Sequence, residues 1–162
     1  MRKVWEPLAS REQTGRRMYN LVARFSGDLQ RITTTKNGKN VPLASLTLGE
    51  FHRLVREIPY MRDEKPVEVV ARPKYILSGI NGEYSADCKK KGILMGAWFV
   101  ENGFPAVTGF RFVAVSTKPS RSIHHVMPQV NIDGAWLNAD ATYDNQRLFS
   151  PKRVTRYEVL KP

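Results

Sequence analysis

Residues 88–102 read CKKKGILMGAWFVEN, and this stretch decides the fold. Its apolar side chains recur at helical spacing and predict one buried stripe, made by Ile93, Leu94, Ala97, Trp98 and nearby Val100. Gly103 follows as a helix C-cap, and Pro105 prevents the helix from continuing. The stretch therefore predicts a helix that begins at Cys88, the only cysteine in the chain.

A thiol at a helix start has a specific chemistry. The unpaired backbone N–H groups and the positive end of the helix dipole favour the thiolate, which is the form that attacks a carbonyl carbon. The lysines at 89–91 add positive charge, although like charges at a helix N-terminus oppose the dipole. The alternative is that Cys88 is a small buried hydrophobe. One cysteine excludes an intramolecular disulfide framework and any site with several cysteine ligands.

Three short extended runs follow the helix. Residues 107–116 and 125–132 are consistent with adjacent strands, and Pro128 suggests a bulge or an edge in the second run. A turn at Asp133-Gly134 leads into a third strand at 135–140. If the last two runs pair as a hairpin, His125 and Asp140 lie almost opposite one another near its open end.

These positions supply a nucleophile, a base and an orienting group. A cysteine at a helix start, packed on such a sheet, would place Cys88, His125 and Asp140 together, as cysteine-dependent acyl transfer requires. His124 and His125 point to opposite faces of a strand, so only one can meet Cys88, and the spacing to Asp140 favours His125. The alternatives are an exposed or backbone-bonded role for His124 and a turn-capping role for Asp140.

The preceding part of the chain predicts helices and a hairpin. Helical spacing occurs around Met18 to Phe25, and residues 36–39 form a turn signal. Thr47 and Glu50 have the spacing of a capping box, which predicts a helix over about 48–58. The β-branched run from Val67 predicts extended chain over 67–77, where Pro73 disfavours helix at the residue before it.

Together these elements predict a single α+β domain over 1–162, in which N-terminal helices and a helix that begins with Cys88 pack on an antiparallel sheet. We divide it into a basic helical and hairpin lead-in at 1–51, a catalytic core at 52–145 and a basic C-terminal extension at 146–162.

Four motifs of the core resemble those of a known family. In chain order they are Ala86-Asp87-Cys88 at a helix start, His125-Val126 at a strand start, Gly134-x-Trp136, and Asp140-Ala141-Thr142-Tyr143. They resemble the transglutaminase-like core of the papain-like cysteine fold over residues 52–145. The lead-in is similar to that of short bacterial and phage-encoded members, through Ile58-Pro59-Tyr60, Asp63, Glu68 and Pro73.

The resemblance implies roles for individual residues. It makes Cys88 the nucleophile, His125 the general base and acid, and Asp140 the orienting residue. It allows Trp136 to wall the site rather than to be core. We also assign Tyr84 to substrate binding and expect oxyanion donors from the Cys88 N–H and from 81–84.

The implied reaction is acyl transfer through a thioester on a protein or peptide substrate, without a cofactor. Hydrolysis of a peptide or amide bond is favoured over glutamine transamidation, because small microbial relatives of this kind are often proteases or amidases.

The basic charge suggests a partner, and two rival functions follow, one from the resemblance to phage-encoded members and one from charge alone. The net charge is +11, and residues 146–162 carry five basic side chains against one acidic. We therefore expect the basic flanks, including Lys36, Lys39, Lys152 and Arg153, to dock on an anionic partner, either nucleic acid or an acidic protein. The first rival is a non-enzymatic phage virion or assembly protein with the same fold. The second is a sequence-independent nucleic-acid binder.

Other classes of function lack a signal in the sequence. Adjacent strand histidines diverge, and no pair is spaced i,i+4, so we expect no metal site. No glycine-rich nucleotide loop, secretory signal or apolar stretch long enough for a membrane span is present. The expectation is a soluble cytoplasmic protein, in the host cell if phage-encoded, or a virion component.

Overall fold

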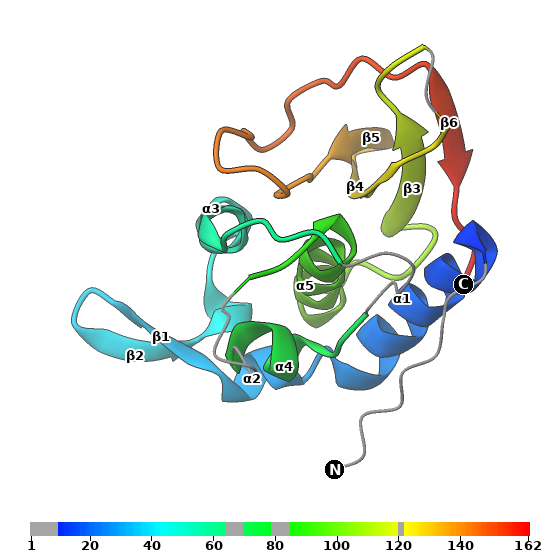
Figure 1. The fold of residues 1–162 in the computed structure, drawn as a ribbon. Helices are drawn as coiled ribbons and strands as arrows, with labels where there is room; N and C mark the ends of the chain where they lie inside the picture. Colours follow the sequence, from blue (N-terminus) through cyan, green and yellow to red (C-terminus); the bar gives the residue numbers. More distant parts are fainter. Residues whose placement is uncertain (1–9, 64–69, 79–84, 120–121) are drawn as a thin grey trace.

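The computed structural model describes residues 10–63, 70–78, 85–119 and 122–162 (Figure 1). In chain order its elements are α1 (Arg11–Phe25), α2 (Asp28–Arg31), β1 (Thr33–Lys36), β2 (Lys39–Pro42), the 3-10 helix η1 (Leu43–Ser45), α3 (Leu48–Glu57), α4 (Pro73–Ser78), α5 (Cys88–Glu101), β3 (Phe110–Ser116), β4 (His125–Ile132), β5 (Ala135–Asn138) and β6 (Arg156–Val159). Among these residues, no helix is long and apolar enough to cross a membrane.

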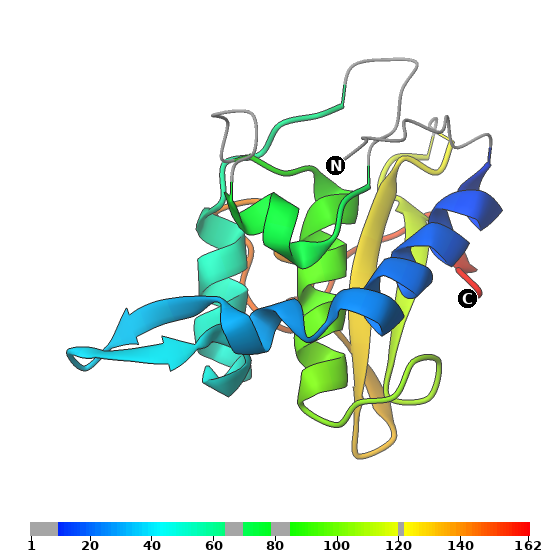
Figure 2. The ribbon, with the colours of Figure 1, turned by 90° about the horizontal axis from the view of Figure 1, so that it is seen from below.

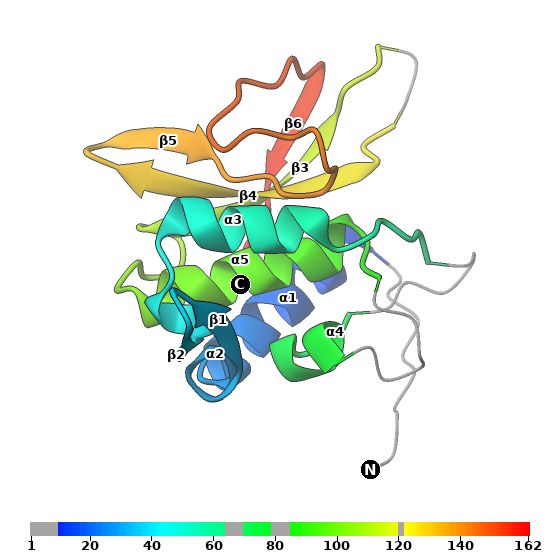
Figure 3. The same cartoon turned by 90° about the vertical axis from the view of Figure 1, so that its left-hand side faces the viewer.

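Helix α5 lies at the centre of the molecule, with α1, α3 and α4 around it and the sheet on its remaining side (Figures 1 and 3). The sequence predicted one buried stripe, but every residue from Gly92 to Phe99 is buried, as in a helix surrounded by protein. The lack of a side chain at Gly96 is part of the reason that neighbouring elements pack so closely on α5. A β-carbon there would lie 2.9 Å from a ring carbon of Phe112 and 3.0 Å from a methyl of Val22, so the helix packs closely on both neighbours.

The four-stranded antiparallel sheet has the order β5-β4-β3-β6. The predicted α+β arrangement, with the Cys88 helix packed on an antiparallel sheet, is therefore confirmed. Strand β3 begins at Phe110 rather than at residue 107, because the Val107 N–H donates to the Phe110 carbonyl (2.7 Å) in a turn and Val107 has a positive φ of 74°.

Pro128 lies in an internal strand, so the predicted bulge or edge is wrong. It pairs with Phe112 in an uninterrupted β3–β4 register. The Phe112 carbonyl accepts from Leu160 (2.9 Å), on the side away from Pro128, while the Pro128 carbonyl accepts from Ala139 N–H (3.0 Å). The missing N–H of Pro128 therefore faces the end of β5 and interrupts no bond between β3 and β4.

The predicted lead-in elements are present. The capping box is formed in both directions, because Thr47 Oγ1 accepts from Glu50 N–H (3.3 Å) and the Glu50 carboxylate accepts from Thr47 N–H (2.9 Å). Asn37 and Gly38 both have positive φ, 51° and 75°, as a tight hairpin turn requires. The β1–β2 hairpin projects away from the rest of the molecule (Figure 2).

The extended chain predicted over 67–77 is wrong for its second half. Residues 67–69 lie outside the described residues, and Pro73 begins helix α4. Proline suits the first position of a helix, where its missing N–H would have had no partner. Arg72 stays outside the helix and donates through Nε to the Asp28 carboxylate (2.9 Å), which ties α4 to α2.

One hydroxyl joins three segments that are far apart in the chain. Tyr19 on α1 donates to the Leu160 carbonyl (3.2 Å) and accepts from the Phe112 backbone N–H (2.9 Å). The segment at Leu160 is thereby fixed to helix α1 and to strand β3.

Candidate active site

Cys88 begins α5, as the sequence predicts. Asp87 is the N-cap, and its carboxylate accepts from Lys90 N–H (3.0 Å). Cys88 remains partly exposed, whereas Asp87 beside it is buried. As the first residue of the helix, Cys88 has a backbone N–H without a partner inside the helix.

His125 and Asp140 meet at the open end of the β4–β5 hairpin. Nε2 of His125 lies 2.7 Å from Oδ2 of Asp140. Strand β5 ends at Asn138, but Ala139 N–H still donates to the Pro128 carbonyl (3.0 Å), so the pairing continues to the residue before Asp140. Both side chains are buried, with His125 6% and Asp140 2% exposed.

Cys88 completes the arrangement through the other side of the imidazole. Burial acts to lower the pKa of His125, but hydrogen bonds with Asp140 and Cys88 act against it and raise the pKa to about 9. Because Asp140 occupies Nε2, Nδ1 is the ring nitrogen left for the thiol. The structure thus brings together all three residues that the sequence proposed as catalytic.

Asp140 is held in its ionised form. Thr142 donates to Oδ1 from its backbone N–H (3.0 Å) and its hydroxyl (2.5 Å). Lys152 donates to Oδ2 (2.6 Å), the same oxygen that His125 contacts. Burial acts to raise the pKa of Asp140, but His125 and Lys152 outweigh it and hold the pKa below its usual range.

Two further side chains, which the sequence analysis missed, hold the Asp140 segment from the helical side. His52 on α3 lies with Nε2 2.8 Å from the Asp140 carbonyl oxygen, and burial lowers its pKa. Lys91 on α5 donates to the Thr142 carbonyl (2.8 Å), and burial lowers its pKa to about 8. Nothing in a helical pattern distinguishes these inward polar contacts from ordinary core positions.

The three lysines after Cys88 do not form the positive cluster that the sequence suggests. Lys89 pairs with Asp87 and lies 3.5 Å from Asp63, while Lys90 pairs with Asp63 at 2.6 Å. Lys91 is buried among carbonyl oxygens. The positive charges of Lys89 and Lys90 beside the helix start are therefore balanced by two aspartates, Asp87 and Asp63.

Two exposed tyrosines lie near Cys88. Tyr60 bridges to Ala86 just before α5, and its ring lies 5.2 Å from that of Tyr143, which follows the Asp140 turn. Burial, together with electrostatic interactions with Cys88 and Tyr143, raises the pKa of Tyr60 to about 12. The rings are 42% and 45% exposed, so they present an aromatic surface beside the thiol.

The remaining predicted residues lie elsewhere. His124 is exposed and contacts Thr117 Oγ1 (3.2 Å) and the Ser122 carbonyl (3.1 Å), as expected for the histidine on the opposite face. Trp136 is paired with Asn131 at the far end of β4 and lies under the Arg111 guanidinium (4.0 Å). Tyr84 lies outside the described residues, as do the expected oxyanion donors at 81–84.

Within the described part of the chain, no group of three or more His, Cys, Asp or Glu side chains is arranged to hold a metal ion. No family model, curated protein or solved structure matches the chain. The interpretation of the site therefore depends on its own geometry.

Proposed function

We propose that this protein is a cysteine-dependent acyl-transfer enzyme with a transglutaminase-like core of the papain-like type. One observation supports this most directly: a single buried imidazole lies 2.7 Å from a carboxylate oxygen, and the thiol at a helix start helps to raise the pKa of that imidazole. That arrangement supplies a nucleophile, a proton carrier and an orienting group in contact with one another.

The reaction follows from these contacts. Nδ1 of His125 takes the Cys88 proton, and the thiolate attacks the carbonyl carbon of the substrate. The tetrahedral oxyanion is stabilised by the Cys88 backbone N–H at the start of α5. The imidazolium then protonates the leaving amine, which leaves a thioester. Water, deprotonated by His125, attacks the thioester and releases the acid and the thiol.

The surroundings of Cys88 favour a neutral substrate over an acidic one. Lys89 and Lys90 are matched by aspartates, so they do not attract a negative group. Tyr60 and Tyr143 offer exposed rings on which an apolar side chain next to the scissile bond can pack. We propose hydrolysis of a peptide or amide bond, in line with the family resemblance, with transamidation as the less favoured outcome.

The test uses a generic acyl donor, because the substrate is unidentified. Full-length protein is mixed with p-nitrophenyl acetate, nitrophenolate release is followed by absorbance, and acetyl-protein is measured by intact mass. We expect one acetyl group, absent in Cys88→Ala, that disappears on further incubation as water attacks the thioester. Added hydroxylamine gives acetohydroxamate if amines compete with water as acceptors.

Alkylation by iodoacetamide gives the second readout. Cys88 should react at neutral pH in the folded protein and much more slowly in Asp140→Asn, in which the imidazolium is no longer held by a carboxylate. A thiol that stays inert until the protein is denatured would contradict the enzymatic function and favour a non-enzymatic assembly protein, including a virion component.

A further inference from the structure

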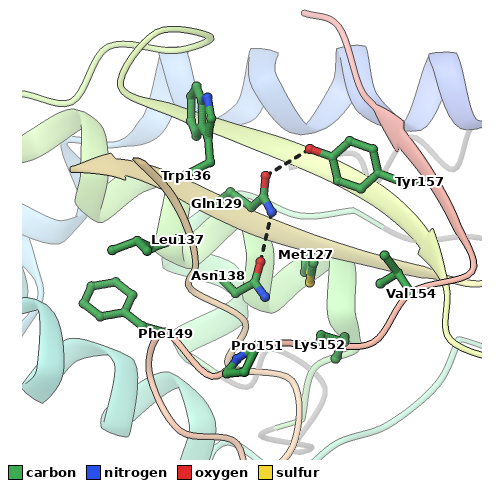
Figure 4. Close-up of a pocket in the computed structure, with 10 residues that line it drawn as sticks. All are labelled: Met127, Gln129, Trp136, Leu137, Asn138, Phe149, Pro151, Lys152, Val154 and Tyr157. Carbon is green, nitrogen blue, oxygen red and sulfur yellow. Dashed lines mark hydrogen bonds between the residues drawn. The ribbon is translucent and has the colours of Figure 1, made fainter. Parts of the chain in front are cut away.

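A groove of about 330 Å³ crosses the face of the sheet that is turned away from α5 (Figure 4). The strands present alternate residues to the two faces. Phe110, Phe112 and Val130 join the main core, whereas Met127 belongs to a separate small cluster with Val113 and Val115. The residues that line the groove are Met127, Gln129, Trp136, Leu137, Asn138, Phe149, Pro151, Lys152, Val154 and Tyr157.

The floor of the groove is held by a polar network. Gln129, which is only 8% exposed, accepts through Oε1 from Arg111 Nε (2.9 Å) and from the Tyr157 hydroxyl (3.2 Å). Its amide nitrogen donates to Asn138 Oδ1 (2.9 Å). Figure 4 shows Gln129 between Tyr157 and Asn138, with Met127 beside it. The groove is therefore fixed in shape before anything binds.

One wall of the groove includes Phe149, a residue with a strained backbone conformation. Phe149 has a φ of 62°, in the left-handed region, which costs a residue with a side chain about 1–2 kcal/mol. Its N–H donates to the Asn138 carbonyl (2.9 Å), and the Asn138 side chain donates to the Ser150 carbonyl (3.1 Å). These bonds hold the 147–151 loop on the end of β5, so the Phe149 ring lines the groove.

One end of the groove is cationic, because Arg111 lies against Trp136 and Tyr157, two of the residues that line it. Arg111 covers the Trp136 ring at 4.0 Å and donates to the Tyr157 hydroxyl (2.6 Å). Within the described ranges no carboxylate pairs with Arg111. Lys152, at the other end, is paired with the Asp140 carboxylate, so Arg111 is the cation that the groove offers to a ligand. The segment that forms one side, 146–162, carries five basic side chains against one acidic.

We propose that this groove binds an extended acidic peptide segment. An apolar side chain of the peptide packs on Met127 and Val154, while a carboxylate pairs with Arg111 in the two-pronged geometry that guanidinium groups favour. A nucleic acid fits less well, because the face of Trp136 on which a base would stack is already covered by Arg111.

The binding does not depend on the chemistry of Cys88. The groove shares one residue with the candidate active site, Lys152. Failure of the proposed enzymatic function would leave peptide binding intact, and Cys88→Ala should bind as the unchanged protein does.

The experiment measures fluorescence anisotropy with the full chain and three labelled probes. The first is the capped peptide Glu-Asp-Leu-Glu-Asp, the second its amide counterpart Gln-Asn-Leu-Gln-Asn, and the third a single-stranded oligonucleotide. We expect the acidic peptide to bind at least about tenfold more tightly than the amide peptide. Binding should weaken as salt rises.

Two variants test the groove itself. Arg111→Gln removes the cation, and Val154→Asp places a repelling carboxylate on the wall without touching the Gln129 network. Each should weaken binding of the acidic peptide about tenfold or more, while Lys39→Gln, which removes a positive charge from the remote hairpin, should not. Retention of the native circular dichroism spectrum controls for misfolding.

The proposal is overturned if the acidic peptide does not bind, or if it binds no better than the amide peptide. It is also overturned if both variants bind the peptide unchanged, or if the oligonucleotide binds more tightly and loses affinity in the same two variants.

Discussion

Two histidines from different regions of the molecule contact the same residue, Asp140, yet their pKa values are shifted in opposite directions. His52, on α3, lies 2.8 Å from the backbone carbonyl, and its pKa is lowered. His125, at the start of β4, lies 2.7 Å from the carboxylate, and its pKa is raised to about 9. Both are nearly inaccessible, 2% and 6% exposed.

The difference shows that burial alone does not decide whether a histidine can serve as an acid or a base. Burial disfavours the charged imidazole at both sites. A carbonyl dipole does not compensate for lost hydration at His52, whereas an ionised carboxylate does at His125. One histidine is therefore a fixed neutral contact, and the other can take and return a proton.

The largest expected effect comes from removal of the His125 imidazole. His125→Ala should slow nitrophenolate release from p-nitrophenyl acetate by about 10²- to 10⁴-fold, the usual contribution of a general base. His124→Ala is the matched control and should leave the rate nearly unchanged, because His124 faces Thr117 instead. If the two results were exchanged, the base would be His124.

The pH dependence of stability should differ in sign between the two histidines. The raised pKa of His125 contributes stability that is complete below pH 6.5 and is lost as pH rises through about 9, in total about 3 kcal/mol. The lowered pKa of His52 has the opposite effect, because its contribution is lost as pH falls below 6.5.

Urea unfolding at pH 6.5 and pH 9 measures the alkaline loss of stability that comes from His125. His125→Ala should lack most of the alkaline loss, and Cys88→Ala should show a reduced loss, because Asp140 still holds the imidazolium. An alkaline loss that persists at full size in His125→Ala would have another origin.

His52 should matter for stability more than for the reaction. His52→Leu leaves the Asp140 carbonyl without its partner and should lower the free energy of unfolding by about 1–3 kcal/mol. His52→Gln can place an amide N–H near the lost Nε2 and should recover part of this. Equal destabilisation by both substitutions, measured by urea unfolding, would mean that packing rather than the hydrogen bond accounts for the loss.

The smallest expected effect concerns the cation that shares Asp140 Oδ2 with His125. Lys152→Met removes a positive charge 2.6 Å from that oxygen, so the carboxylate should attract the His125 proton more strongly. We expect the pKa of His125 to rise by about one further unit in an NMR titration. Lys161→Met, at an exposed position, is the control, and a fall in the pKa of His125 would contradict the shared contact.

Local signals in the sequence predicted much of the fold. The cap at Thr47, the helix start at Cys88 and the turn at Asp133 each depend on neighbours a few residues away, and each is confirmed. Pro128 was interpreted wrongly, because the effect of a proline depends on where its missing N–H would point. That direction is set by tertiary pairing.

The site was predictable only in part for the same reason. His125 and Asp140 lie on one hairpin, so spacing was enough to place them together. Lys152 looked like part of a solvated basic flank, but its side chain is only 17% exposed and contacts Asp140. His52 and Lys91 come from helices whose packing on the 140–142 segment leaves no local signal.

The Tyr19 hydroxyl has a consequence for the order of folding during synthesis. It joins residues separated by 93 and by 141 positions, so its bond with Phe112 forms only after residue 112 is made and its bond with Leu160 only after residue 160 is made. Helix α1 is therefore made before both of the segments that fix it, which favours slow, late closure of the core.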